Sequence, residues 1–291
     1  MKFSFQKYLL AKQSVDDRAL NKDVLSALKE NLPEQPIQII EVGAGIGTML
    51  RRLIRWDIIQ KAEYVMVDEM AANVEYASAW IPQFAAETGL RVERSGKSLR
   101  LQDEARDIKI QFVQEDVFDF IQINNEPANL LIANAFLDLL PMPDSLLKLL
   151  SLTKNLAWLT INFDGVTTFE PAIDVELDNK IERLYHETMD RRSTGGDSKS
   201  GRHLFGHFQN AGTKILAAGA SDWLVYGQDG RYENDERFFL NCILGFLEES
   251  LTDHDDLNAE EFENWIITRR AQIENGELTY IAHQTDFLVR I

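Results

Sequence analysis

Short apolar runs that alternate with amphipathic stretches constrain the fold of this chain more than any other feature. The runs are rich in β-branched residues and mostly apolar on both faces, as strands buried in a parallel sheet must be. They are Ile37–Val42, Tyr64–Asp68, Ile108–Val113, Asn129–Ala133 and Leu156–Phe163. Helical spacing predicts helices between them, at Thr48–Ile59, Ala71–Glu87 and Ser145–Leu150. Strand–helix–strand repetition predicts right-handed crossovers and a doubly wound α/β sheet with helices on both faces.

The second half of the chain changes character. Its pattern predicts a long amphipathic helix, a Gly- and Ser-rich loop, two further strands and two more helices. In chain order these are Ile173–Met189, Asp190–His203, Lys214–Tyr226, Glu236–Leu251, Ala259–Gln272 and Tyr280–Ile291, with the loop second and the strands third and last. The segment Leu90–Leu101 predicts a hairpin that projects from the sheet. No disordered linker separates the halves, so we expect a single domain over residues 1–291. Its expected parts are an N-terminal helical cap (1–36), a ligand-binding core (37–163) and a substrate side (164–291).

Charge and cysteine content exclude several classes of protein. Thirty Lys and Arg residues against 47 Asp and Glu residues give a net charge of −17, which repels a phosphate backbone. We therefore expect neither a nucleic acid nor a membrane as partner. Cys242 is alone, so an internal disulfide is impossible and a Cys-based zinc site lacks ligands, and we expect no metal. No apolar stretch resembles a signal peptide or a membrane span, so a soluble, cytoplasmic protein is expected.

A glycine-rich loop follows the first predicted strand and leads into a helix. The segment Glu41–Gly47 reads EVGAGIG, and glycines there let the backbone turn tightly and approach a ligand closely. The dinucleotide fingerprint G-x-G-x-x-G needs a third glycine at position 48, where this chain has Thr48. The pattern present is E-x-G-x-G-x-G, and this counts against a nicotinamide dinucleotide.

Two acids follow the next predicted strands. Asp68 ends the second strand about 20 residues past the loop, where an acid can accept hydrogen bonds from ribose hydroxyls. Asp116 comes just after the third strand, and all these groups should meet at the carboxyl ends of the strands. They suit an adenosine that carries no diphosphate. Each acid also has a structural interpretation, because Glu41 could cap a helix, Asp68 could be a turn residue and Asp116 could be a helix N-cap.

Residues 37–163 resemble the class I S-adenosylmethionine-dependent methyltransferases. The resemblance rests on four segments in order, EVGAGIG (Glu41–Gly47), VDEM (Val67–Met70), QEDVF (Gln114–Phe118) and NLLIANAF (Asn129–Phe136). It implies S-adenosylmethionine as the cofactor, glycines along its methionine and ribose, an acid on the ribose and an acid at the adenine edge. The cofactor-binding residues expected from it are Glu41, Gly43, Gly45, Gly47, Asp68, Met70, Asp116, Val117 and Asn134. Arg18 could meet the cofactor's carboxylate, with a surface ion pair as the alternative.

The resemblance also implies a mostly parallel seven-stranded sheet. Lys214–Tyr226 and Tyr280–Ile291 look like the sixth strand and the antiparallel seventh. The family usually joins these by a short turn, whereas two predicted helices intervene here. We therefore expect a helical insertion before the last strand, and the role of Asn234–Glu277 stays open.

Methyl transfer places few demands on the side chains around the acceptor. Alignment with the methyl group can suffice, and a base is needed only if the nucleophile arrives protonated. No catalytic dyad stands out in the sequence. The segment Asn134–Leu137 lacks the prolines of base-modifying amino-methyltransferases, which argues against a nucleic-acid substrate. Asp138 could act as a base, but an ordinary surface acid before Pro141 is the preferred interpretation.

A local basic cluster near the predicted Gly- and Ser-rich loop is unexpected in so acidic a protein. Its proposed substrate-binding members are His186, Arg191, Arg192, Arg202 and His203. Such a loop could close as a lid and clamp a carboxylate or phosphate, since Arg makes two-pronged contacts with either. The alternative is a solvated mobile loop whose charges are balanced by nearby acids.

These observations predict an enzyme that transfers a methyl group from S-adenosylmethionine to a small-molecule acceptor, which is anionic if the clamp forms. One alternative is a non-catalytic S-adenosylmethionine-binding module that serves as a partner subunit. A nicotinamide-dependent oxidoreductase is a weaker alternative. A polyamine-synthase relative would show an acidic pair at the end of the fourth strand, where this chain has Asn134 and Ala135. The acceptor atom and the oligomeric state do not follow from the sequence.

Overall fold

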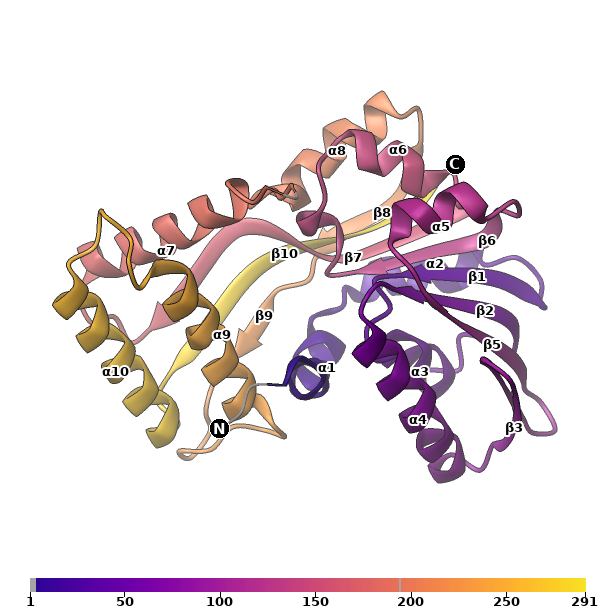
Figure 1. Ribbon diagram of the computed structural model, residues 1–291, viewed down its shortest axis with the longest axis horizontal. Coiled ribbons are helices and arrows are strands. Elements are labelled where there is room, and N and C mark those ends of the chain that lie inside the picture. The colour runs from indigo at the N-terminus through magenta and orange to yellow at the C-terminus, as the bar shows by residue number, and fades with distance from the viewer. Residues whose placement is uncertain (1–3, 194) are drawn as a thin grey trace.

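A computed structural model describes residues 4–193 and 195–291 (Figure 1). Within these residues ten strands form one sheet in the order β3-β4-β5-β2-β1-β6-β7-β10-β8, with β9 paired to β10. The strands are β1 (Ile37–Val42), β2 (Lys61–Asp68), β3 (Arg91–Ser95), β4 (Ser98–Gln102), β5 (Asp107–Gln114), β6 (Ala128–Asn134), β7 (Thr153–Glu170), β8 (Lys214–Ala220), β9 (Trp223–Val225) and β10 (Thr279–Arg290). Strands β5, β2, β1, β6 and β7 are parallel, and β10 is antiparallel to both β7 and β8. This confirms the doubly wound, mostly parallel sheet.

Helices cover both faces of this sheet, as the strand–helix alternation predicts. They are α1 (Phe5–Ala19), α2 (Lys22–Asn31), α3 (Thr48–Arg55), α4 (Ala71–Glu87), α5 (Val117–Ile123), α6 (Asp144–Leu150), α7 (Val175–Asp190), α8 (Ser200–Asn210), α9 (Glu236–Leu251) and α10 (Ala259–Asn275), with a 3₁₀ turn η1 (Leu137–Leu139). Apolar residues of α2, α3 and α4 pack against one face of the sheet, and those of α5, α6 and α8 pack against the other. The predicted helical insertion is present as α9 and α10, which precede β10.

The predicted hairpin extends the sheet, and its expected projection from the sheet is wrong. Strand β4 pairs with β5, so that Leu99 lies beside Ile110 and Leu101 lies beside Ile108. All four side chains are buried in the main core. Burial of these apolar side chains holds the hairpin in the plane of the sheet. The hairpin therefore adds two strands to the edge of the sheet, which has more than the seven strands expected.

Strands β7 and β10 are longer than their sequence patterns indicate, and they carry the C-terminal lobe. Strand β7 continues past Phe163 to Glu170, where it pairs with Thr279 of β10. In Figure 1 these two strands run out from the core beneath α7 and toward α9 and α10. Helix α1 lies between this lobe and the core and contacts α9, β9 and α3. The sequence pattern underestimates the length of β7, because polar and apolar residues are mixed after Phe163 and the continuous apolar run ends there.

The segment Asp190–His203 is only partly a loop, and Thr194 within it lies outside the described residues. Helix α8 begins at Ser200, so the expectation that Arg202 and His203 belong to a mobile loop is wrong. Apolar side chains of α8 explain the helix, since Leu204 and Phe208 are completely buried. The ring of Phe208 packs edge-on against Phe287 of β10, with 5.2 Å between ring centroids.

Candidate functional site

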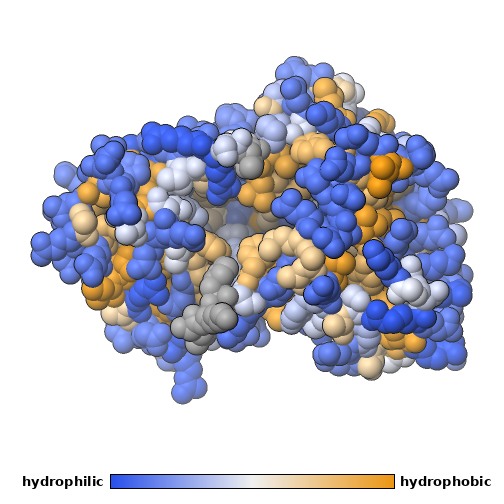
Figure 2. Space-filling view, viewed as in Figure 1, coloured by the Kyte–Doolittle hydropathy of each residue, from blue (hydrophilic) through white to orange (hydrophobic). Residues whose placement is uncertain are grey.

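A cavity of about 510 Å³ opens at the carboxyl ends of β1, β2, β5 and β6. Among the predicted cofactor residues it is lined by Glu41, Gly43, Gly45, Asp68, Met70, Asp116, Val117 and Asn134. Figure 2 shows this side of the molecule hollowed near its centre, with apolar side chains along part of the wall. Segments that are far apart in sequence therefore meet at one place, as expected for a doubly wound sheet.

The glycine loop needs its glycines for two reasons. Gly43, Gly45 and Gly47 have φ angles of 60°, 56° and 84°, a left-handed conformation that side chains rarely adopt. A Cβ atom on Gly43 would also lie 2.4 Å from Cδ2 of Phe136, so the aromatic ring can pack directly on the loop. Gly47 does not line the cavity. It is the N-cap of α3, and it turns the chain into that helix.

Asp68 holds the loop in place. Its Oδ2 atom accepts a hydrogen bond of 2.7 Å from the backbone N–H of Gly45, and its Oδ1 atom accepts from Met70 N and Asn73 Nδ2, both at 3.0 Å. Asp68 is buried, whereas the neighbouring Glu69 is exposed and also lines the cavity. Sequence reasoning missed Glu69 as a candidate, although it stands inside the VDEM segment.

The remaining predicted acids are also anchored by protein contacts. The hydroxyl of Tyr64 donates a 2.7 Å hydrogen bond to Oε2 of Glu41, and burial raises the pKa of Glu41 to about 8. Glu41 is thus mostly protonated at neutral pH. Asp116 is the N-cap of α5 and accepts from Phe118 N at 2.7 Å, so its structural interpretation is correct while it also lines the cavity.

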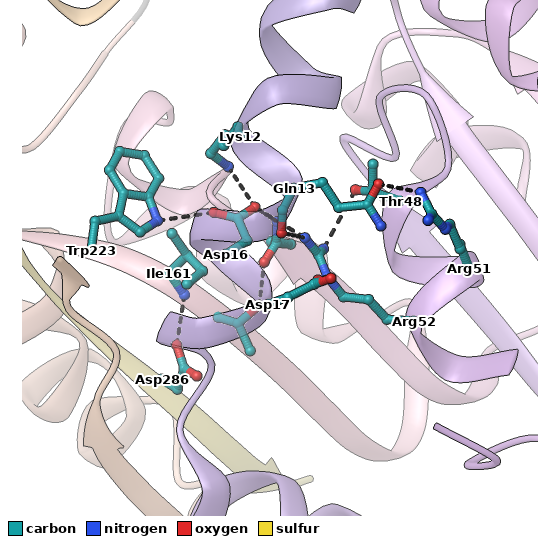
Figure 3. Close-up of polar contacts among 12 residues, drawn as sticks. Lys12, Gln13, Asp16, Asp17, Thr48, Arg51, Arg52, Ile161, Trp223 and Asp286 are labelled. Atoms are coloured by element: carbon teal, nitrogen blue, oxygen red, sulfur yellow. Dashed lines mark hydrogen bonds and ion pairs between the residues drawn. The ribbon is translucent and has the colours of Figure 1, made fainter. Parts of the chain in front are cut away.

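Helix α1 forms a wall of the cavity through Phe5, Leu9, Lys12 and Asp16. Figure 3 shows Lys12 and Asp16 side by side on this helix. The Nζ atom of Lys12 lies 3.0 Å from Oδ2 of Asp16, and Nε1 of Trp223 donates to Oδ1 at 2.9 Å. The buried guanidinium of Arg52 lies 3.4 Å from Asp16, so this carboxylate joins α1, α3 and β9.

Arg18 does not reach the cavity. Its Nη1 atom lies 2.5 Å from Oε1 of the buried Glu236, at the start of α9. The expectation that Arg18 meets the cofactor is therefore replaced by its alternative, an ion pair. Lys12, six residues earlier on α1, is the cation of this helix that lines the cavity.

The predicted basic cluster is not a single clamp. Four of its five members are held by other side chains: His186 Nε2 lies 3.0 Å from Thr167 Oγ1, Arg191 pairs with Glu187, Arg202 with Asp164 and His203 with Asp197. Burial also lowers the pKa of His186, which favours its neutral form. Arg192 is the member that lines the cavity.

The described parts of the chain contain no group of three or more His, Cys, Asp or Glu side chains placed to hold a metal ion. No helix in 4–193 or 195–291 is long and apolar enough to cross a membrane.

The comparisons with known proteins identify the fold. No protein-family model matches the sequence, and no curated protein matches it. Among solved structures, a candidate methyltransferase from Bacillus halodurans C-125 aligns with 93% of this chain and 99% of its own, at 10% identity and a TM-score of 0.51. A candidate methyltransferase of Haloferax volcanii in complex with the Trm112 activator aligns with 99% of this chain and 95% of its own, at 14% identity and a TM-score of 0.49. A methyltransferase from Thiobacillus denitrificans, solved with S-adenosylhomocysteine, aligns with 99% of both chains at 12% identity and a TM-score of 0.46.

The strand order and the first of these alignments agree. The series β5-β2-β1-β6-β7-β10-β8, with β10 antiparallel, and the glycine loop after β1 define the class I methyltransferase fold. The chain has this fold.

Proposed function

We propose that the protein binds S-adenosylmethionine in this cavity and transfers its methyl group to a small-molecule acceptor. The observation that carries the proposal is the glycine loop, which lines a cavity of about 510 Å³ at the carboxyl ends of the central strands. Asp68 fixes this loop by accepting a hydrogen bond from the backbone N–H of Gly45. A side chain at Gly43 would clash with the ring of Phe136, which packs on the loop and also lines the cavity.

The lining residues fit the parts of this cofactor. In this proposal the exposed carboxylate of Glu69, which lines the cavity, accepts hydrogen bonds from the ribose hydroxyls, and Asp68 acts through the loop. Met70 and Val117 provide apolar surface for an adenine ring, and Asp116 lies beside Val117. Lys12 supplies a cation for the methionine carboxylate, because its ammonium has three N–H donors and Asp16 is its one ion-pair partner among the described residues.

The chain's own contribution to the reaction is alignment and exclusion of water. The bound cofactor supplies an electrophilic methyl group on a sulfonium. The walls of the cavity hold the acceptor atom in line with that methyl group, and such positioning can contribute about 7–11 kcal/mol. Helix α1 covers the glycine loop, and a Cβ atom on Gly45 would lie 3.2 Å from Leu9.

Isothermal titration calorimetry tests the proposal. We expect S-adenosylmethionine and S-adenosylhomocysteine to bind with micromolar dissociation constants, near −8 kcal/mol, and NAD to give no heat of binding. Lys12→Met should weaken S-adenosylmethionine about tenfold through loss of the carboxylate contact, while Lys22→Met, at the start of α2, should not. Binding of NAD alone would overturn the proposal.

A further inference from the structure

Two residues of opposite charge at one corner of the cavity, Arg192 in its wall and Asp138 next to lining residues in the chain, have no ion-pair partner among the described residues. Arg192 lines the cavity, and no carboxylate within the described ranges lies in salt-bridge contact with it. Asp138 lies in η1, between the cavity-lining residues Phe136 and Leu139. The Oδ1 atom of Asp138 is buried without a hydrogen-bond partner, so the residue is not the ordinary surface acid that its sequence context indicates.

Contacts of the intervening backbone bring the two segments together. The N–H of Asp197 donates a 3.2 Å hydrogen bond to the carbonyl oxygen of Asp138. A Cβ atom on Gly195 would lie 2.5 Å from the nitrogen of Pro141, so the chain after α7 packs closely against the segment that follows η1. Arg192 is joined to this packed segment, because its carbonyl oxygen accepts from Gly195 N at 3.1 Å.

The other charged and titratable groups around Asp138 are satisfied elsewhere or neutral. Lys12 pairs with Asp16 on α1, and Asp197 pairs with His203 of α8. Tyr185 of α7 lies near both Asp138 and Arg192, and burial raises the pKa of its phenol. Burial also raises the pKa of Asp138, against the opposing effects of Arg192 and Lys12. The carboxylate and the guanidinium thus affect one another across the corner without forming a pair.

A buried carboxylate without a partner is costly, and its cost is removed when a ligand supplies the missing hydrogen bonds. The same ligand can place an anionic group on Arg192, whose guanidinium makes two-pronged contacts with carboxylate or phosphate. We propose that the methyl acceptor is a small amine that also carries an anionic group, with its ammonium on Asp138 and its anion on Arg192. This inference rests on the proposed methyltransferase function and names its substrate class.

The proton balance gives Asp138 a catalytic role. An ammonium has no lone pair, so the acceptor nitrogen first transfers one proton to the carboxylate of Asp138. The neutral nitrogen then attacks the methyl carbon, the carbon–sulfur bond breaks, and its electron pair stays on sulfur. The product is an N-methylammonium and a neutral thioether, and protonated Asp138 releases its proton to solvent.

The first experiment identifies the class of acceptor. Wild-type protein and S-adenosylmethionine labelled in the methyl group are incubated with three pools. One contains glycine, β-alanine, taurine and phosphoethanolamine, one contains ethylamine, propylamine and ethanolamine, and one contains acetate, propionate and phenol. We expect transfer of label to the first pool at a rate at least tenfold above the other two. Preferred labelling of another pool, or of none while S-adenosylmethionine binds, overturns this inference and leaves cofactor binding intact. Absence of S-adenosylmethionine binding instead overturns the proposed function.

Variants then separate the two charges. With the labelled member of the first pool as substrate, Asp138→Asn should lower kcat at least a hundredfold and remove the rise of kcat/KM with pH that reports the base. Arg192→Ala should raise KM ten- to a hundredfold, and Arg192→Lys should restore part of the loss. The exposed residues Asp144 and Arg183 provide matched controls, and Asp144→Asn and Arg183→Ala should leave both constants unchanged. An unaltered pH profile in Asp138→Asn, or an unaltered KM in Arg192→Ala, contradicts the assigned roles. Calorimetry with S-adenosylhomocysteine shows that each variant is folded.

Discussion

Asp68 and Glu69 are adjacent in sequence, yet the structure gives them different environments. The carboxylate of Asp68 is occupied by donors from the loop and α4, whereas Glu69 is exposed at the cavity. A carboxylate that organises a loop affects both stability and binding. One that only touches the ligand affects binding alone.

We therefore expect Asp68→Ala to lower the free energy of unfolding by about 2 kcal/mol, because it strands the N–H of Gly45, and to weaken S-adenosylmethionine as well. Glu69→Gln should leave stability unchanged and weaken S-adenosylmethionine about tenfold, the value of one charge-assisted hydrogen bond. Urea denaturation and calorimetry measure the two quantities, and Glu75→Gln, on the exposed side of α4, is the control. Equal losses of stability in Asp68→Ala and Glu69→Gln would contradict the division of roles.

The raised pKa of Glu41 predicts that the stability of the protein depends on pH. Burial disfavours the charged form and raises the pKa of Glu41 in the folded protein from its ordinary value of 4.5 to about 8. The folded state therefore keeps a proton that the unfolded state releases between these values. The stabilising effect of that proton is fully present below pH 4.5 and is lost as the pH rises toward 8.

Glu41→Gln should flatten the fall in the free energy of unfolding between pH 5 and pH 8 by up to about 1.4 kcal/mol per pH unit. Chemical denaturation at several pH values measures this slope in both proteins. Glu63→Gln is the matched control, since Glu63 is exposed and pairs with Lys109 at the surface. A slope in Glu41→Gln equal to that of the wild type would show that Glu41 is ionised in the folded protein.

At the scale of the elements, one buried arginine joins the C-terminal helices to the sheet. Arg269 of α10 is fully buried, lies 2.7 Å from Asp178 of α7 and donates to the carbonyl oxygen of Pro171 at 2.7 Å. Nε1 of Trp265 donates to the same carboxylate. This group of contacts fastens α10 and α7 to the end of β7.

Arg269→Met should lower the free energy of unfolding by about 3–5 kcal/mol, because it leaves Asp178 buried without its charge partner. The side chain of the adjacent Arg270 is 41% exposed and pairs with Glu248, so Arg270→Met should cost about 0–1 kcal/mol. Urea denaturation compares the two variants directly. Losses of similar size would mean that the buried pair contributes no more than a surface one.

Several element boundaries follow from local sequence alone. Strand β1 and helices α4 and α9 begin and end where periodicity predicts, because each has a strong apolar pattern and a clear break in it. The extent of β7 and the start of α8 do not follow from local pattern. The last residues of β7 are stabilised by pairing with β10, and α8 is stabilised by packing on Phe287. Both contacts join segments that are distant in sequence.

At the scale of the whole molecule, α1 couples the cavity to the C-terminal lobe. Lys12 and Asp16 line the cavity, while Tyr8 stacks on Phe239 of α9 with 5.9 Å between ring centroids. A ligand in the cavity therefore contacts a helix that also contacts the lobe. We expect ligand binding to order α1 together with the glycine loop.

Hydrogen exchange tests this coupling. S-adenosylhomocysteine at about 100 times its dissociation constant should stabilise the protein by about 2.7 kcal/mol. Amides of Phe5–Ala19 that exchange by local opening should slow markedly, and corresponding amides of α10, which does not line the cavity, should not. Unchanged exchange in α1 would show that this helix does not contact the ligand.

The sequence by itself determines the order of strands and helices and the position of the glycine loop. Periodic apolar residues specify each element locally, and the glycines of Gly43–Gly47 are required by local backbone geometry. Tertiary structure alone decides the environment of each charged side chain. Arg18 pairs with Glu236, Asp16 binds Trp223, and Asp138 keeps a buried oxygen without a partner. These outcomes depend on segments more than 50 residues apart packing together. Burial and electrostatic pairing are therefore properties of the folded molecule, and no local pattern encodes them.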